Sequence, residues 1–207
     1  MSAFSSTIFA CVLCGAVAAQ AGGDVAALER MTFAMGTSLR LEVQAGSRAA
    51  AVRASEAAMK AVEAAEQRLS SWRQDSELCR FLAAPVGEEF SASSQLCAEL
   101  RRAQEWCQQT GGAFDPGIGA LVTAYDLRGA GRWPGASQLA AARARSGVAR
   151  LHVRERALVR NLDVGLDAGA FGKGAALDAA ARALRSAGAQ SASLDFGGQL
   201  LYVGDVG

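Results

Sequence analysis

One stretch of the chain concentrates residue types that bind anionic ligands: residues 163–174, which read D-V-G-L-D-A-G-A-F-G-K-G. Glycines let backbone N–H groups approach a ligand closely, and the N-terminus of a helix favours an anion. Lys173 adds a compact positive charge of the kind that pairs with phosphate. The stretch therefore predicts phosphate binding, and the alternative is a glycine-rich turn that serves only packing.

The two carboxylates of this stretch, Asp163 and Asp167, admit two interpretations. They form simple ion pairs with the neighbouring lysine, or they hold a sugar hydroxyl or a divalent metal that accompanies phosphate. The spacing matches neither G-x-x-x-x-G-K-[ST] nor G-x-G-x-x-G, so the common phosphate-loop patterns do not decide between them.

Elements on either side place this loop between a strand and a helix. Leu162, Val164 and Leu166 alternate with other residues, which predicts a strand entering the core. A helix is expected over residues 175–187, with Gly188 at its C-terminal cap. Its apolar face is formed by Leu177, Ala180, Ala181 and Leu184.

The rest of the chain predicts an α+β fold, with a mostly antiparallel sheet and packed helices. Helical periodicity and caps indicate helices over residues 48–69, from Ser93 or Ser94 to Gly111, and over 137–146. Alternating apolar residues indicate strands within 31–43, at 151–153 and 157–164 as a hairpin, and within 191–203 around a Gly197-Gly198 bulge or turn.

Three further positions carry side chains suited to a planar ligand. Met35, in the turn before the first predicted strand, is able to cover a flat ring or to pack as ordinary core. Trp72 follows the first helix as a stacking platform or as a lid on the core. The loop 111–119 places Phe114 and Asp115 among glycines, and Asp115 is either a ligand or a turn former before Pro116.

Composition excludes several function classes. Among the 207 residues the net charge is +1 and no Lys/Arg block occurs, so no nucleic-acid partner is expected. The single histidine, His152, alternates with apolar residues at a surface strand position. One histidine excludes a multi-histidine zinc site and leaves little room for a Ser-His-Asp triad.

The N-terminus predicts a signal peptide over residues 1–21. Residues 8–19 form an apolar run too short to span a bilayer, and Ala19-Gln20-Ala21 fits the A-x-A cleavage pattern. We expect export and a periplasmic location, with lipoprotein attachment to the outer face of the inner membrane as a variant. Cleavage removes Cys11 and Cys14. The remaining odd number of cysteines argues against a disulfide framework, and packing is expected for Cys97 and Cys107.

Five motifs in order give the chain a resemblance to a known family. They are M-G-T at Met35, L-S-S-W-R-x-D-S-E-L at 69–78, G-G-A-F-D-P at 111–116, D-A-G-A-F-G-K-G at 167–174 and L-D-F-G-G at 194–198. This series resembles the FAD:protein FMN transferases, the ApbE-type flavin transferases. The resemblance implies that residues 22–207 are the N-terminal part of a flavin transferase domain with an ApbE-like fold.

The resemblance also implies a reaction and a set of site residues. Such enzymes use magnesium to transfer FMN from FAD to a threonine of an acceptor protein, typically a subunit of a membrane redox complex, and AMP leaves. The magnesium would be contacted by the backbone carbonyl of Ala170, and no catalytic residue is implied. The FAD-binding residues implied by position are Met35, Trp72, Ala113, Phe114, Asp115, Asp167 and Lys173.

Members of that family extend beyond residue 207, and the resemblance places their other magnesium ligands there. We therefore expect a fold that is incomplete at its C-terminal end, in either a fragment or a naturally short, inactive form. The alternative function is a non-catalytic protein that binds FAD or another nucleotide. A third possibility is an exported domain that binds only another protein, with purely structural glycine loops.

Overall fold

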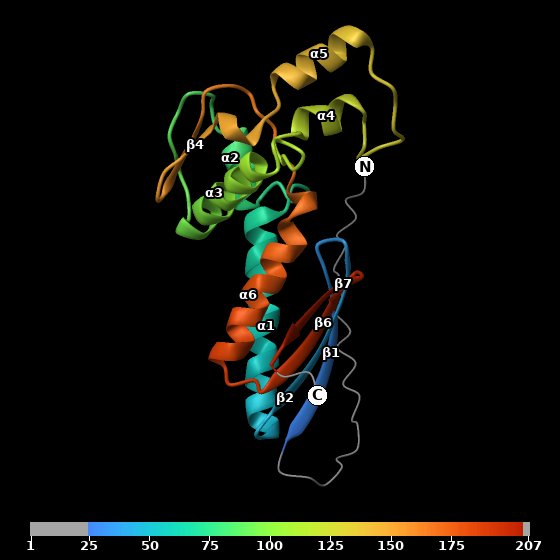
Figure 1. The fold of residues 1–207 in the computed structure, drawn as a ribbon, viewed down its shortest axis with the longest axis vertical. Coiled ribbons are helices and arrows are strands. Elements are labelled where there is room, and N and C mark those ends of the chain that lie inside the picture. Colours follow the sequence, from blue (N-terminus) through green and yellow to red (C-terminus); the bar gives the residue numbers. More distant parts are fainter. Residues whose placement is uncertain (1–24, 205–207) are drawn as a thin grey trace, which may run out of the picture. The chain divides into compact units, whose positions relative to one another are not determined.

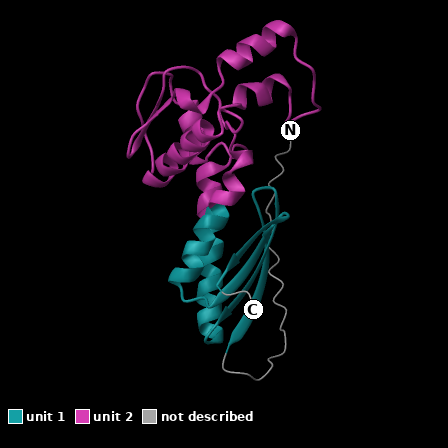
Figure 2. Cartoon of the chain, viewed as in Figure 1, with its two compact units in different colours: residues 1–63, 176–207 teal, residues 64–175 magenta. Residues whose placement is uncertain are grey.

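The computed structural model of the chain describes residues 25–204, which fall into two compact units. The first unit combines residues up to 63 with residues from 176 onward, and the second comprises residues 64–175 (Figure 2). The predicted signal peptide, residues 1–21, lies outside the described residues, and so do Cys11 and Cys14.

The first unit is built on a four-stranded antiparallel sheet in the order β1-β2-β6-β7 (Figure 1). Its strands are β1 (Ala26–Ala34), β2 (Thr37–Ala45), β6 (Ser191–Phe196) and β7 (Gln199–Val203). Leu39, Leu41 and Val43 of β2 are buried and alternate with exposed residues, as predicted. The period of two therefore directs one face of the sheet to the core.

Helices α1 (Arg48–Leu69) and α6 (Gly172–Ser186) lie beside this sheet (Figure 1). The bounds predicted for α1 are confirmed, and Ser47 accepts a hydrogen bond from Ala50 N–H at its start. The apolar face predicted for α6 is buried, and Gly188 follows it with φ +83°. However, α6 begins three residues before the predicted start, at Gly172, so Lys173 lies in its first turn.

The second unit consists of short helices and a three-stranded antiparallel sheet in the order β3-β5-β4. The predicted second and third helices are confirmed within a few residues as α3 and α5, as is the predicted hairpin of β4 and β5. His152 is exposed on β4, as expected. The elements are α2 (Glu77–Ala83), β3 (Phe90–Ser91), α3 (Ser94–Gln109), α4 (Gly119–Ala124), α5 (Ala136–Ala144), β4 (Leu151–Val153) and β5 (Ala157–Arg160), with 3-10 turns η1 (Val148–Arg150) and η2 (Ala168–Ala170).

The strand predicted from Leu162, Val164 and Leu166 is wrong. Strand β5 ends at Arg160, and the segment after it makes single backbone hydrogen bonds to another loop instead of a ladder. Val164 and Leu166 are nevertheless buried, whereas Leu162 is exposed. The alternating apolar residues therefore reflect burial of a loop segment. A buried loop segment of this kind has the same sequence pattern as a half-buried strand.

The three described cysteines are free thiols. Cys97 and Cys107 are buried on α3, and desolvation by burial raises the pKa of both thiols. A thiol that stays protonated is a poor nucleophile, so packing is confirmed as the role of these two cysteines. Among residues 25–204, no helix is long and apolar enough to cross a bilayer.

Two glycines with the same backbone angle test how closely the strands of the first unit pack. Gly204 and Gly198 both have φ +86°, but a Cβ at Gly204 would lie 2.1 Å from the carbonyl oxygen of Gln190, whereas one at Gly198 would meet nothing within 4 Å. Both alanine variants carry the cost of a left-handed residue, about 1–2 kcal/mol. Gly204→Ala should lose roughly 1–3 kcal/mol more through the forced backbone shift. Urea unfolding measures both losses, and equal values would contradict this packing.

Candidate functional site

The two glycine-rich loops singled out in the sequence lie against each other in the second unit. Gly119 N–H donates to the Gly165 carbonyl at 2.9 Å, and Asp167 N–H donates to the Pro116 carbonyl at 2.9 Å. A Cβ at Gly119 would lie 2.6 Å from the Gly165 carbonyl carbon, and a Cβ at Gly165 would lie 2.9 Å from the Ala120 nitrogen. Only glycine allows this approach, so these glycines serve loop-to-loop packing.

Asp115 is the turn former of the first loop. Its Oδ1 accepts hydrogen bonds from Gly117 N–H at 2.7 Å and from Val148 N–H at 2.9 Å. The first bond is an Asx turn, and the second ties the loop to the start of η1. Phe114 beside it is half-buried and Ala113 is exposed. Asp115 is thus a turn former, and the Phe114-Asp115 corner of the loop lies next to Asp167.

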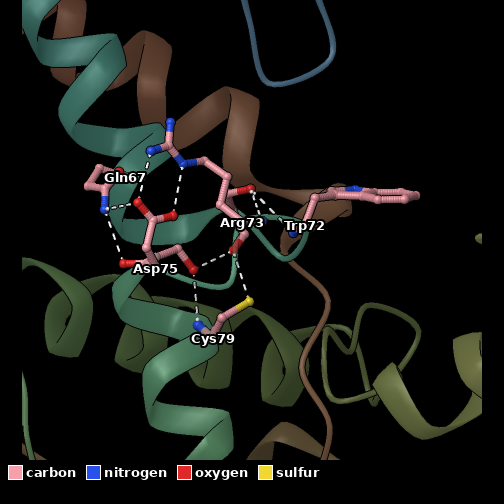
Figure 3. Close-up of polar contacts among 7 residues, drawn as sticks. Gln67, Trp72, Arg73, Asp75 and Cys79 are labelled. Carbon is pink, nitrogen blue, oxygen red and sulfur yellow. Dashed lines mark hydrogen bonds and ion pairs between the residues drawn. The ribbon is translucent and has the colours of Figure 1, made fainter. Parts of the chain in front are cut away.

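Serine side chains shape the loop that carries Trp72 (Figure 3). The Ser70 hydroxyl accepts from the N–H groups of Trp72 and Arg73 at 3.3 and 3.2 Å. Buried Ser76 caps α2 by accepting from Cys79 N–H, and its hydroxyl donates to the Ser70 carbonyl at 2.6 Å. These bonds close the loop on itself, so the polar residues of the L-S-S-W-R-x-D-S-E-L motif have a structural role here.

A second group of bonds fixes the far side of the same loop. Arg73 and Gln67 donate to the Asp75 carboxylate, and these hydrogen bonds, with that from Arg73 the stronger, lower the pKa of Asp75. Figure 3 shows the Trp72 indole extending away from this cluster. Trp72 is 70% exposed, so the loop presents a large aromatic surface to solvent and leaves it open to stacking.

Arg128 connects Trp72 to the second glycine loop. Its guanidinium carbon lies 4.8 Å from the centroid of the Trp72 ring, and its Nη1 donates to the Ser71 carbonyl at 2.6 Å. Its Nη2 donates to Asp167 Oδ2 at 2.8 Å. Asp167 also accepts from Gly169 N–H at 2.7 Å through Oδ1 and thereby caps η2. One arginine therefore joins two of the residues predicted to bind the ligand.

The carboxylates of the second loop pair with arginines and not with Lys173. Asp163 accepts from Arg160 at 2.7 Å and lies 3.3 Å from Arg145, while Asp167 pairs with Arg128. The simple ion pair with the lysine, one of the two interpretations of these carboxylates, is therefore not formed. Within residues 25–204, Lys173 makes no ion pair, and it is half-buried in the first turn of α6 beside N–H groups that have no intrahelical acceptor.

A small pocket of about 190 Å³ opens where the two glycine loops meet. Gly119 and Gly165 form part of its wall, and its polar lining side chains are those of Thr123, Arg128, Arg145 and Asp163. The close contact of the loops thus ends in a concave, polar surface that Arg128 shares with Trp72. Such a surface suits the polar part of a ligand whose flat part stacks outside.

Met35 is the predicted site residue that belongs to the first unit. It occupies the tip of the β1–β2 hairpin with φ +46°, followed by Gly36 with φ +77°. Two positive φ angles define a type I′ turn, in which methionine is an unusual first residue. The other predicted residues all lie in the second unit: Trp72, Ala113, Phe114, Asp115, Asp167, Ala170 and Lys173.

The described residues do not make a complete magnesium site. No group of three or more metal-ligating side chains occurs between Val25 and Gly204. The exposed Ala170 offers one backbone carbonyl, whereas magnesium requires near-octahedral oxygen coordination. The structure therefore supplies one candidate ligand for the metal.

Sequence reasoning missed Arg128, which contacts two of the predicted site residues, Trp72 and Asp167. It lies in a glycine-containing turn after α4 and has no motif of its own, and its partners are 57 and 39 positions away along the chain. Ser70 and Ser76 were present in the recognised motif, but only the structure assigns their bonds. No spacing pattern in a single sequence reports such long-range pairs.

Comparison with solved structures shows the same fold. The flavin transferase ApbE from Vibrio cholerae matches with a TM-score of 0.74 and 24% identity, over 85% of this chain and 59% of that chain. The apo form of the Pseudomonas stutzeri flavinyl transferase ApbE matches with a TM-score of 0.76 and 23% identity, over 86% and 58%. The predicted fold class, α+β with mostly antiparallel sheet and an ApbE-like arrangement, is confirmed.

Sequence comparison points to the same group of proteins. A protein named FAD:protein FMN transferase from Treponema pallidum is 28% identical over 95% of this chain and 57% of its own length. One of the same name from Vibrio cholerae is 28% identical over 69% of this chain and 44% of its own. The chain thus spans about half the length of these relatives. The sequence model described as the ApbE family matches residues 35–207, and this chain belongs to that family.

Proposed function

We propose that the protein transfers FMN from FAD to a threonine of an acceptor protein. Two named FAD:protein FMN transferases are its relatives, and its fold is that of the ApbE flavin transferases. The observation that carries the proposal is the convergence, in one unit, of the Trp72 loop and both glycine loops through Arg128, Asp167 and the Gly119–Gly165 contact. It joins a stacking surface to a polar pocket.

The proposed step is a phosphoryl transfer. The threonine oxygen forms a bond to the phosphorus of the FMN half, while the bond from that phosphorus to the bridging oxygen of the pyrophosphate breaks. AMP leaves with the electron pair, and the hydroxyl proton passes to solvent. Positioning and charge supply most of the catalysis in such reactions. This is the chemistry that the site residues have to support.

The residues of the second unit divide this work. Trp72 stacks on a flat ring of FAD with its exposed indole. Ala113 and Phe114 line the FAD pocket. Lys173 and the first N–H groups of α6 attract the pyrophosphate, because both present positive charge without an anionic partner among the described residues. Asp167 accepts a hydrogen bond from a polar group of the nucleotide, and Asp115 holds the corner that shapes the pocket.

Magnesium belongs to the proposal as a required component of the reaction mixture. Ala170 would contribute its carbonyl to the metal, which when bound neutralises phosphate charge. The acceptor is a subunit of a membrane redox complex, reached after export of the protein to the periplasm. The second candidate is a nucleotide-binding protein without transferase activity, which would use the same stacking surface and polar pocket.

The chain has two lysines, Lys60 and Lys173, and substituting each in turn gives a matched test of FAD binding. Lys173→Ala should weaken FAD binding by roughly 1–3 kcal/mol, because it removes a charge-assisted contact to phosphate. Lys60→Ala, which changes the other lysine of the chain on the exposed surface of α1, should leave the affinity unchanged. Quenching of flavin fluorescence measures both dissociation constants. Equal affinities in the two variants would remove Lys173 from the site.

A direct assay separates the two candidate functions. The protein is incubated with FAD, magnesium and a peptide bearing an acceptor threonine, and the peptide mass is measured. The proposal predicts a mass gain of one FMN together with AMP in solution, and no gain with free FMN in place of FAD. Tight FAD binding without transfer would support the non-catalytic alternative, and no FAD binding would reject both.

Export is tested by the N-terminus of the mature protein. When the full chain is expressed in a Gram-negative host, the periplasmic form should begin at Gly22, because cleavage follows the A-x-A pattern. Ala19→Leu and Ala21→Leu together should block processing. Mass spectrometry of the purified protein reads the terminus, and an intact Met1 in the cytoplasmic fraction would contradict the prediction.

A further inference from the structure

We infer that Arg128 is a positioning residue of the nucleotide site, which holds the Trp72 indole and the Asp167 carboxylate in one fixed arrangement for FAD. The inference rests on the proposed function, since it assigns a role within that same site. It adds a residue that no recognised motif of the chain contains.

Three contacts give Arg128 this role. The guanidinium packs on one face of the Trp72 ring, donates to the carbonyl of the preceding residue, Ser71, and donates to Asp167. Arg128 is thus bonded to both the Trp72 loop and the η2 loop. The arginine therefore sets the distance between an aromatic surface and a carboxylate that belong to different loops.

The turn that carries Arg128 is itself fixed. Asp126 has φ +52°, and its carbonyl accepts from the N–H groups of Gly129 and Gly131 at 3.0 and 3.1 Å. Leu127 N–H donates to the Val122 carbonyl at 3.0 Å, which ties the turn to α4. A backbone held at both ends presents the arginine in one direction, so its contacts are not those of a free surface side chain.

Arginine is suited to this role and lysine is not. A guanidinium is planar, so it stacks on an indole with its face while its edge donates in two directions. An ammonium has no such face. Because Arg128 covers one side of the Trp72 ring and the residue remains 70% exposed, the opposite side is open for a flat ring of the nucleotide.

The charge balance also argues against Arg128 as a direct phosphate ligand. Its side chain is 35% exposed and pairs with an Asp167 carboxylate that is only 19% exposed, so a phosphate taking Arg128 would leave that carboxylate without its cation. Loss of one partner of a shielded ion pair is costly. Lys173, which has no carboxylate partner among the described residues, is the better phosphate ligand.

The first experiment follows Trp72 without ligand. In a background where Trp106 and Trp133 are changed to Phe, Trp72 is the only tryptophan of the chain. Arg128→Met should raise the acrylamide quenching constant of Trp72 about twofold, because it uncovers one ring face. Arg143→Met, at an exposed position on α5, is the matched control and should change nothing. An unchanged quenching constant in Arg128→Met would overturn the proposed positioning of Trp72 by Arg128.

The second experiment measures FAD affinity by flavin fluorescence. Arg128→Met and Arg128→Lys should both raise the dissociation constant about tenfold, whereas Arg143→Met should not. In a Trp72→Ala background, the effect of Arg128→Met should fall below threefold, because its partner is gone. A direct phosphate ligand would keep its tenfold effect there and would tolerate lysine, and either result would overturn the positioning role.

The experiments distinguish a failure of the proposed function from a failure of the role assigned to Arg128. If the unaltered protein does not bind FAD, the proposed function is rejected, and the nucleotide role of Arg128 is rejected with it. If the protein binds FAD and Lys173→Ala weakens binding while Arg128→Met does not, only the role of Arg128 is rejected.

Discussion

The contact between Gly119 and Gly165 is the constraint on which the second unit depends. Each glycine faces the other's loop so closely that a side chain at either position would lie within 3 Å of main-chain atoms. The backbone bond between them places Pro116 beside Asp167, and hence the Phe114-Asp115 corner beside the acidic cap of η2. The glycines act by bringing side chains of two loops together. For Gly165 this corresponds to packing, the alternative to ligand contact that the sequence left open.

The loop that carries the exposed Trp72 side chain is also held rigid by contacts within the unit. Ser70 and Ser76 satisfy the backbone groups between α1 and α2, and Ser76 is fully buried while doing so. An exposed tryptophan on an unconstrained loop would lose conformational entropy on stacking. On a loop closed by its own hydrogen bonds much of that cost is met during folding, so the indole is available to a ligand in a defined orientation.

The sequence predicts an element of this structure well when the element is long enough to show a regular apolar periodicity. Helices α1 and α3 were predicted with accurate bounds, because each carries several turns of apolar periodicity and a serine at its start. Helices α2 and α4 are seven and six residues long, too short for that periodicity, and were not predicted. Strand β1 was missed because its alternation is irregular, with Met31 and Phe33 exposed.

The residues of the candidate site likewise fall into those that a local motif predicts and those that it does not. Trp72, Asp167 and Lys173 were identified by residue type within local motifs, and the structure brings the first two together through Arg128. The segment containing Val164 and Leu166 was assigned to a strand because burial alone produces the same alternation. Arg160, one partner of Asp163, lies only three residues away in the sequence. The partners Arg145 and Arg128 could not be predicted, since they are placed by turns whose geometry depends on the rest of the unit.

The distribution of charge around the second glycine loop explains why an anion would bind at one end of it. Asp163 is neutralised by Arg145 and Arg160, and Arg160 also donates to the carbonyls of Leu82 and Ala84 at the end of α2. Asp167 is neutralised by Arg128. Lys173 is the residue of the loop that carries a positive charge, and it lies in the first turn of α6, where the helix presents N–H groups that have no intrahelical acceptor. A phosphate that binds at the helix start therefore meets positive charge that is not already paired with a carboxylate among the described residues.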